Sequence, residues 1–409
     1  MYAWTDCPVL LDTTYSIAAW SVLVIFLIAT GFWLVEVLVI GRARQLPATY
    51  DPSEIQARIL TIDAQEVVQA TVDSLPADIG DVRVIAETEI DVTGATVHVV
   101  PDGFACAARR KGRAVEWARR TVPTDATFVL YLDEDTLVPS LPPFPDVDIV
   151  QLMEQPIRSK SWVCYFAEIF RMGFQIEQRT FPRLRYPLYA WGGGFAVKAA
   201  VEDDLTWDVP TVTEDTNFIW RAFADPDREM AVLPVKLLNQ APPTIVELIH
   251  QRRRWISGSR LDAHLLPVRY RLLSILRNTA WGLVVLSPLL VLPLVAPISM
   301  VFAPTLYQVA IVVQLVGLFG WGVIGYWYYG ERLRVLAALM LTLPVVAILH
   351  AVGALWAIVQ PTRTFRVTEK VPPAEIADER LDDLAFETPP PVSGTAEPTR
   401  DDRDVDVRT

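Results

Sequence analysis

The sequence predicts an α/β domain with a mostly parallel sheet, joined to an α-helical transmembrane bundle. Three observations support this fold class. The chain is 52% hydrophobic yet has a formal net charge of −12, so apolar and charged residues must lie in different parts of it. Apolar stretches of strand length alternate with helix-like stretches in the middle of the chain. Long apolar runs, nearly free of charge, stand on both sides of that middle region.

The first apolar run, residues 15–40, has the length of one transmembrane helix, which needs about 20 residues. Glu36 is its one charged residue, and the run is too long for a signal-peptide core. Arg42 and Arg44 follow directly. The positive-inside rule therefore predicts that this end is cytoplasmic and that residues 1–14 are extracytoplasmic.

Residues 50–278 are expected to form the catalytic domain. Its predicted buried strands are 58–62, 82–86, 96–100 and 127–132, and its predicted intervening helices are 65–75 and 107–119. Alternation of this kind builds βαβ units with parallel strands. Ligands of such sheets bind beyond the carboxyl ends of the strands, so the site residues are expected there.

Residues 279–360 are predicted to form a C-terminal transmembrane region of about three helices. No charged residue occurs from position 280 to position 330, and a third apolar run covers 335–360. Four crossings in total would place the tail opposite the catalytic domain, whereas the basic residues after position 360 favour the same side. Three prolines in the first of these runs leave a re-entrant or interfacial segment open as an alternative.

Residues 371–409 contain 11 acidic residues, four basic residues and six prolines, which predicts a disordered acidic tail. Only five of the 36 basic residues are Lys. An acidic, Lys-poor chain suits a halophilic source, because strongly hydrated carboxylates keep a protein soluble in a salt-rich cytoplasm. A GC-rich genome is the alternative. The three cysteines form no CxxC motif, which argues against a disulfide scaffold or a zinc site.

The strongest local signal is the stretch 128–135, in which a hydrophobic strand runs into Asp133, Glu134 and Asp135. Carboxylates at i and i+2 after a strand can bind Mg²⁺ or Mn²⁺, and the open positions of the metal suit a diphosphate. Such a metal would neutralise charge on a leaving nucleoside diphosphate. A solvated turn is the alternative.

Two further motifs carry charged side chains. In Thr213–Asp215 a carboxylate could be the general base that takes a proton from an acceptor hydroxyl, although an ordinary helix N-cap has the same pattern. Gln251–Trp255 reads QRRRW. Its arginines can bind phosphates bidentately and Trp255 can stack on a sugar. Binding of anionic lipid headgroups is the alternative for this cluster.

Two stretches could bring a ligand close to the backbone. Trp191, Gly192, Gly193 and Gly194 leave room for such an approach, although a plain loop is the alternative. Lys111 opens a predicted helix, where its cation and the backbone amides could hold phosphate; an exposed basic helix is the alternative. Nucleic acid is not expected as a partner, because the domain is acidic and its basic cluster lacks interleaved aromatic residues.

The order of these motifs, followed by membrane helices, resembles the family 2 inverting glycosyltransferases. That family has a GT-A fold and includes the cellulose, chitin and hyaluronan synthases. The resemblance covers roughly residues 55–370 and is closest to the egghead-type β-mannosyltransferases. The similar stretches are 189–198, 205–208, 213–215 and 251–255.

The resemblance implies a role for each motif. Asp133 and Asp135 would bind the metal and the diphosphate. Asp215 would be the catalytic base, with Glu214 beside it. The resemblance also implies contacts to the diphosphate and the acceptor end for Gln251, Arg254 and Trp255, and to the acceptor for Gly192 to Gly194. Beside these, Lys111 is expected to contact the donor and Trp191 the acceptor.

Two other stretches bear on the resemblance. Residues 365–370, FRVTEK, are similar to the F-x-V-T-x-K gating segment that follows the membrane helices of the synthases. Members of the family usually carry an Asp after the second strand that recognises the nucleobase. Here Glu87 is the nearest candidate.

We therefore expect a multi-pass membrane glycosyltransferase with a cytoplasmic catalytic domain. It would move a sugar from a nucleotide-sugar donor, GDP-mannose or a UDP-hexose, to a lipid-linked or glycan acceptor with inversion. A processive polysaccharide synthase is one alternative, and polymer among the products would identify it. A catalytically silent membrane scaffold and a metal-dependent phosphoesterase are the others. The sequence leaves the sugar, the nucleobase and the oligomeric state open.

Overall fold

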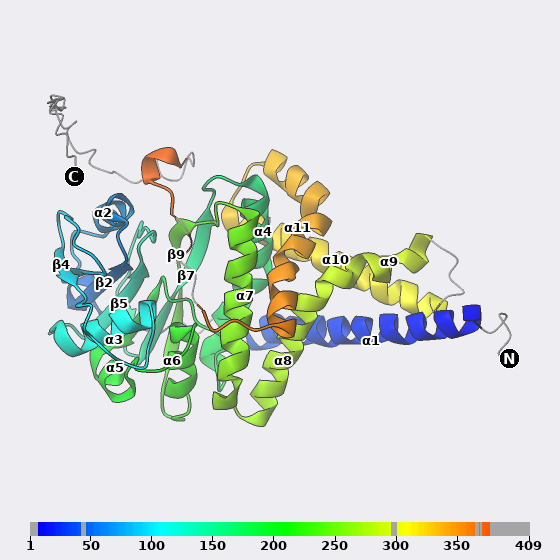
Figure 1. Cartoon of the computed structure of the whole chain (residues 1–409), viewed down its shortest axis with the longest axis horizontal. Helices are drawn as coiled ribbons and strands as arrows, with labels where there is room; N and C mark the ends of the chain where they lie inside the picture. The colour runs from blue at the N-terminus through cyan, green and yellow to red at the C-terminus, as the bar shows by residue number, and fades with distance from the viewer. Residues whose placement is uncertain (1–6, 42–45, 296–300, 365–367, 369, 377–409) are drawn as a thin grey trace, which may run out of the picture.

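The computed structural model describes residues 7–41, 46–295, 301–364, 368 and 370–376. It consists of an α/β domain from which long apolar helices project (Figure 1). The N-terminal helix runs out to the tip of this projection, and the chain returns to the α/β domain after its last long helix. Most of the predicted acidic tail, from residue 377 onward, lies outside the described residues.

A seven-stranded sheet forms the centre of the α/β domain, in the order β4-β3-β2-β5-β8-β7-β9. β8 is antiparallel to both of its neighbours, and every other pair in this sheet is parallel. The strands are β2 (Ile55–Thr61), β3 (Asp81–Ala86), β4 (Thr96–Val99), β5 (Phe128–Asp133), β7 (Ile149–Ile157), β8 (Phe195–Lys198) and β9 (Met230–Gln240). β1 (Ala48–Tyr50) and β6 (Phe144–Pro145) form a separate antiparallel pair.

The four predicted strands are found as β2 to β5. β2 and β5 are buried along almost their whole length, whereas β4, which was predicted to be buried, is an edge strand with exposed and half-buried residues. Val129 and Tyr131 point to one hydrophobic core, which contains residues of α3 and α6. Leu130 and Leu132 point to the other, which contains residues of α2. This alternation is the two-residue period of a strand. The fold class is therefore confirmed as a mostly parallel, GT-A-like sheet.

Helices cover both faces of this sheet, and α4 and α7 lie between the sheet and the projection (Figure 1). They are α2 (Gln65–Asp73), α3 (Lys111–Thr121), α4 (Trp162–Gln175), α5 (Ala199–Leu205), α6 (Glu214–Ala222) and α7 (Ile245–Asp262). α2 and α3 are the two predicted helices. α3 begins four residues later than expected, after Arg110, whose φ of 54° is incompatible with a right-handed helix.

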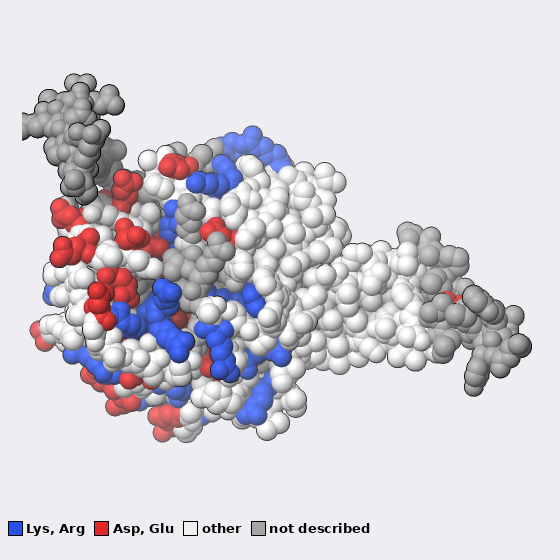
Figure 2. Space-filling model, viewed as in Figure 1, with Lys and Arg blue, Asp and Glu red and all other residues white. Residues whose placement is uncertain are grey.

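Within the described residues, four helices are long and apolar enough to cross a membrane: Asp12–Ile40, Val268–Leu294, Pro304–Tyr329 and Leu333–Val359. In helix labels these are α1 (Cys7–Val35) with the π-helical turn Glu36–Ile40, α8 (Val268–Leu283) with α9 (Ser287–Val295), α10 (Pro304–Tyr329) and α11 (Leu333–Val359). Figure 2 shows charged side chains over the α/β domain and an almost uncharged surface on the projection.

The second of these spans begins at Val268, earlier than the predicted boundary at 279, because α8 passes through that boundary without a break. Arg277 is the charged residue nearest the boundary. It is paired with Glu177, and its Nη1 lies 3.7 Å from Glu36 Oε2 in α1. Arg277, the last charged residue before the predicted membrane region, is therefore neutralised by carboxylates inside the protein.

α11 runs across the direction of α1 and α10 rather than beside them (Figure 1). Its first half packs on α4 through Leu339 and Leu343. In its second half, Gly353 lies against the backbone of Ile249 in α7. Both ends of α11 thus remain at the α/β domain, although its length and composition are those of a membrane-spanning helix.

Candidate active site

A cavity of about 1230 Å³ begins at the carboxyl ends of β2, β3 and β5 and continues between the apolar helices. Most of the predicted site residues line it: Glu87, Lys111, Asp133, Trp191, Gly192, Glu214, Asp215, Gln251, Arg254 and Trp255. Asp135, Gly193 and Gly194 lie beside the cavity but do not line it. Residues from six separate stretches of the domain therefore meet at one place.

Lys111, the first residue of α3, joins the two acidic motifs. Its Nζ lies 2.5 Å from Asp133 Oδ1 and 3.7 Å from Glu214 Oε1. It also donates a hydrogen bond of 3.2 Å to the carbonyl of Gly192. Burial lowers the pKa of Lys111, but Asp133 and Glu214 outweigh it and raise the pKa, so the ammonium group stays charged.

Asp215 is the second residue of α6, where the helix dipole favours a negative charge. Burial and the neighbouring Glu214 nevertheless raise the pKa of Asp215 to about 7, against the opposing charge of Lys111. A pKa near the working pH suits a general base. Thr213 occupies the N-cap position, but its side chain makes no capping hydrogen bond.

The glycine loop lies directly against these carboxylates. A Cβ atom at Gly192 would lie 2.9 Å from Lys111 Nζ and 3.1 Å from Asp215 Oδ2. A Cβ atom at Gly193 would lie 2.9 Å from Asp133 Oδ2. Any side chain at these positions would occupy space beside the acidic groups, which is a physical reason for the run of glycines.

Asp133 and Asp135 have different surroundings. Although burial opposes it, Lys111 and Lys370 hold the pKa of Asp133 below its usual range. Asp135 is only 3% exposed, and its Oδ2 accepts a hydrogen bond of 2.9 Å from the backbone N–H of Gln240. Its Oδ1 lies 2.8 Å from Nζ of Lys370, in the chain that follows α11. Each carboxylate therefore faces an ammonium group.

These two carboxylates are hard oxygen donors of the kind that a divalent cation prefers, although a cation that used Asp135 would have to displace Lys370. In the part of the chain that the structure describes, no group of three or more His, Cys, Asp or Glu residues could hold a metal ion. A metal here would thus need oxygen ligands from a substrate as well, an arrangement that is common for Mg²⁺ bound with phosphates.

The QRRRW motif lies on α7, and its residues face different ways. Gln251, Arg254 and Trp255 line the cavity, and Arg254 Nη1 donates to the carbonyl of Val212 at 3.3 Å. Arg252 is fully buried and donates to Glu168 and to the side chain of Gln251. Arg252 and Arg254 are therefore engaged with other parts of the domain.

Glu87 follows β3 and lines the outer part of the cavity. Its Oε2 accepts a hydrogen bond of 2.6 Å from Nη1 of Arg113 in α3. Arg113 also holds the loop before α3, since it donates to the carbonyl of Phe104 at 3.1 Å. The position predicted for nucleobase recognition thus carries a carboxylate that is fixed by an arginine.

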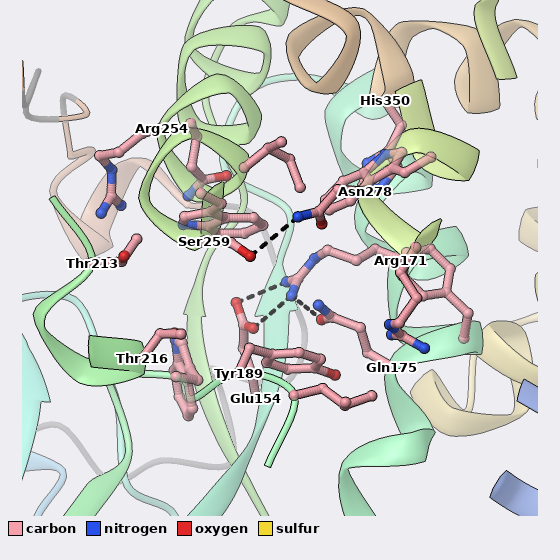
Figure 3. Close-up of a pocket in the computed structure, with 18 of the residues that line it drawn as sticks. Glu154, Arg171, Gln175, Tyr189, Thr213, Thr216, Arg254, Ser259, Asn278 and His350 are labelled. Atoms are coloured by element: carbon pink, nitrogen blue, oxygen red, sulfur yellow. Dashed lines mark hydrogen bonds and ion pairs between the residues drawn. The ribbon is translucent and has the colours of Figure 1, made fainter. Parts of the chain in front are cut away.

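The sequence did not single out a group of buried polar residues farther into the cavity. Figure 3 shows Glu154, Arg171 and Gln175 joined by hydrogen bonds, with Thr213, Thr216 and Arg254 on one side and Asn278 and His350 on the other. Nη1 and Nη2 of Arg171 lie 2.7 and 2.8 Å from the Glu154 carboxylate. The sequence did contain a pattern that could have pointed to these residues. Glu168 and Arg171 are charged residues within the otherwise apolar α4, and His350 is the one ionisable residue between positions 334 and 363.

Comparison with known proteins agrees with this geometry. Residues 128–359 match the family described as glycosyl transferase family group 2. The chain is 22% identical over 296 residues to the beta-1,4-mannosyltransferase egh of Drosophila melanogaster, over 64% of this chain and 63% of that protein, so it spans less than two thirds of this relative.

Two solved structures are similar at low identity. The mannosyltransferase PcManGT from Pyrobaculum calidifontis, in complex with GDP-Man and Mn²⁺, is 15% identical, with a TM-score of 0.49 over 85% of this chain and 98% of that chain. Glucosyl-3-phosphoglycerate synthase from Mycobacterium tuberculosis, with Mn²⁺, UDP and glucosyl-3-phosphoglycerate, is 14% identical, with a TM-score of 0.35 over 52% and 81%.

The match over residues 128–359 covers more than half of the 409 residues and includes the DED, glycine, TED and QRRRW motifs. The chain therefore belongs to glycosyl transferase family group 2 and is a glycosyltransferase.

Proposed function

We propose that this enzyme transfers a hexose, with mannose from GDP-mannose as the first choice, to a lipid-linked acceptor with inversion at the anomeric carbon. The choice of mannose rests on the β-1,4-mannosyltransferase relative from Drosophila. The choice of a lipid acceptor rests on the cavity, which joins Asp215 to α1, α8, α10 and α11. This continuity is the observation that carries the proposal.

The donor is proposed to bind at the carboxyl ends of β3 and β5. Glu87, fixed by Arg113, would contact the nucleoside, and Lys111 and Arg254 would stabilise negative charge on the diphosphate. Mg²⁺ or Mn²⁺ held by Asp133 and Asp135 would add electrostatic stabilisation of the leaving diphosphate. Gly192 leaves room for the donor sugar beside Asp215.

Asp215 is proposed as the general base. In its ionised form it would take the proton of an acceptor hydroxyl as that oxygen attacks the anomeric carbon on the face opposite the leaving diphosphate. An α-linked donor would then give a β-linked product. Trp191 and Trp255 line the same space and offer apolar surfaces for the sugar rings. The arginines after α1 favour a catalytic domain on the cytoplasmic side.

The test is donor turnover by the full chain in proteoliposomes that contain a membrane lipid extract, at high salt. GDP- and UDP-sugars are compared with Mg²⁺, Mn²⁺ or a chelator, and the product linkage is determined by NMR. We expect metal-dependent release of GDP from GDP-mannose and one β-linked mannose per acceptor. Asp215→Asn should abolish release, whereas Asp78→Asn, at an exposed position, should not. An α-linkage, or turnover that persists in Asp215→Asn, contradicts the proposal.

A further inference from the structure

Residues 205–208, LTWD, form the end of α5 and the chain directly after it. None of these four residues lines the cavity. The stretch nevertheless contains a strained backbone position, since Thr206 has a φ of 56°. This left-handed conformation is an outlier for a β-branched residue, and it persists only where the surrounding structure holds it in place. The contacts of LTWD must therefore be strong enough to maintain it.

α6 holds the first half of this stretch. Arg221 in α6 donates from Nη2 to the carbonyl of Thr206 at 2.8 Å. The buried ring of Trp207 stacks on Phe218, also in α6, with a centroid distance of 4.1 Å and an interplanar angle of 21°. LTWD is thus fixed to the helix that carries the proposed base in its first turn.

α3 holds the second half. The backbone N–H of Trp207 donates to Oε2 of Glu116, in the middle of α3, at 2.8 Å, and both residues are buried. Oδ2 of Asp208 accepts a hydrogen bond of 2.8 Å from Nη2 of Arg120, near the end of the same helix. LTWD therefore joins the helix of the proposed base to the helix that begins with Lys111.

The other carboxylate oxygen of Asp208 holds the loop that leads into α3. Its Oδ1 accepts hydrogen bonds from the backbone N–H groups of Ala107 and Ala108, at 2.5 and 3.3 Å. This loop ends at Arg110, whose φ of 54° is a second strained position. Lys111 is the next residue and the first of α3. The loop that Asp208 holds therefore determines where α3, and with it Lys111, begins.

The position of Lys111 has little tolerance. Its Nζ lies 2.5 Å from Asp133 Oδ1 and 3.2 Å from the carbonyl oxygen of Gly192. Hydrogen bonds need both a short distance and good alignment, so a displaced ammonium group loses them. A shift of about 1 Å in a group near the reacting atoms is enough to reduce catalysis strongly. A residue that fixes the start of α3 therefore affects the site without touching it.

We propose that Asp208 is a positioning residue for the donor site: it ties residues 107–110 to α3 and thereby places Lys111 against the donor diphosphate. This inference rests on the proposed function, in which Lys111 stabilises the negative charge of the diphosphate. Asp208 itself touches no substrate and acts through the backbone that it holds. Trp207 fixes the same stretch to α6, so the ammonium group and the proposed base keep a constant spatial relation.

The test is a double-mutant cycle between Asp208 and Lys111, measured on the affinity of the full chain for GDP. Displacement of a fluorescent GDP analogue is followed in detergent micelles with Mg²⁺. We expect Lys111→Met and Asp208→Ala each to raise the dissociation constant of GDP about tenfold, the loss of roughly one charge-assisted hydrogen bond. The double variant should stay within about twofold of Lys111→Met, because residues that act through one another are not additive.

Two further variants separate the loop from the ion pairs of α3. Asp208→Asn keeps an oxygen that accepts from the N–H groups of Ala107 and Ala108 and loses only the charge that faces Arg120, so it should recover most of the affinity. Asp203→Ala is the matched control and should leave the affinity for GDP unchanged. Asp203 also pairs with an arginine of α3, Arg119, at 3.2 Å, but that arginine lies at the far end of the helix from Lys111.

The outcomes distinguish the inference from the proposed function. A double variant that binds GDP about 100-fold more weakly than the wild type would show independent effects and overturn the inference, while the proposed function stands. Asp208→Asn as weak as Asp208→Ala would overturn it in the same way, since the loop contact would not be what matters. Absence of GDP binding by the wild type would instead overturn the proposed donor, and the inference with it.

Discussion

Nζ of Lys111 lies 2.5 Å from Oδ1 of Asp133, and the same ammonium group lies 3.7 Å from Glu214 in the motif that carries the proposed base. One lysine thus connects the group proposed to bind the diphosphate with the groups proposed to activate the acceptor. Its charge lowers the pKa of Asp215, whereas burial and Glu214 raise it. The ionisation of the base depends on this local balance.

The balance predicts the pH dependence of turnover. Because Asp215 must be ionised to act as a base and its pKa is about 7, kcat should rise with pH through about 7 and level off above it. Glu214→Gln removes a negative neighbour, so the rising limb should move to lower pH. Lys111→Met removes a positive neighbour, so the limb should move to higher pH. Initial rates of GDP release from pH 5 to 9, at saturating donor, measure both shifts.

Shifts of both variants in the same direction would contradict this electrostatic account. Asp102→Asn, at an exposed position outside the cavity lining, is the control and should leave the limb unchanged. Lys111→Met should also raise the half-saturating GDP-mannose concentration, because Lys111 is proposed to contact the diphosphate as well.

Lys370 predicts a competition for the proposed metal site. Its ammonium group lies 2.8 Å from Asp135, so a divalent cation that uses Asp135 must displace it. Lys370→Ala should therefore lower the dissociation constant for Mn²⁺ several-fold, as measured by the electron paramagnetic resonance signal of free Mn²⁺ with GDP present. Lys160→Ala, at a position that is 3.9 Å from Glu375 and largely exposed, is the matched control and should leave Mn²⁺ binding unchanged. Weaker Mn²⁺ binding in Lys370→Ala would show that Lys370 supports the site instead.

The two central strands of the parallel half, β2 and β5, could be predicted from the sequence because they are buried on both faces. Ile55, Ile59 and Leu130 are completely buried, and such strands appear as continuous apolar runs between helices. The antiparallel β8 could not be predicted in this way, since it follows directly on a glycine run that is typical of a loop. The path of α11 could not be predicted for a different reason. Composition records that a helix is apolar, but not whether protein or lipid covers it.

The candidate site likewise contains residues that could be predicted from the sequence and residues that only the packing of the helices reveals. Asp133 and Asp215 stand in short motifs at the ends of elements, and Gln251 stands in the QRRRW motif within α7, so the order of the motifs along the chain is informative. Arg171 and His350 lie inside apolar helices, and only the packing of α4, α7 and α11 brings them to the cavity. Arg252 stands within the QRRRW motif, yet its role is internal, which no pattern of charges along α7 reveals.

Gly192 predicts a steric effect on catalysis. In Gly192→Ala the new methyl group would lie 2.9 Å from Lys111 Nζ and 3.1 Å from Asp215 Oδ2, so one of these groups must move. We expect kcat to fall about 100-fold, since small displacements of catalytic groups have effects of this size. Gly103→Ala is the matched control, because a Cβ atom there would have no neighbour within 4 Å. Equal kinetics of the two variants would show that the glycine loop is not close to the reacting groups.

Glu168 predicts a large effect on stability, because it is buried between two arginines. Its Oε2 lies 2.5 Å from Arg171 Nε, its Oε1 pairs with Arg252, and the three side chains are at most 2% exposed. Glu168→Gln leaves two buried cations with one carboxylate fewer, and breaking such a pair costs about 3–5 kcal/mol. The thermal unfolding midpoint in detergent micelles should fall clearly, whereas Asp203→Asn should leave it nearly unchanged. Asp203 also pairs with an arginine, Arg119, at 3.2 Å, but its side chain is 71% exposed, and exposed pairs contribute about 1 kcal/mol or less. Equal midpoints for the two variants would mean that water reaches the Glu168 cluster and screens its charges.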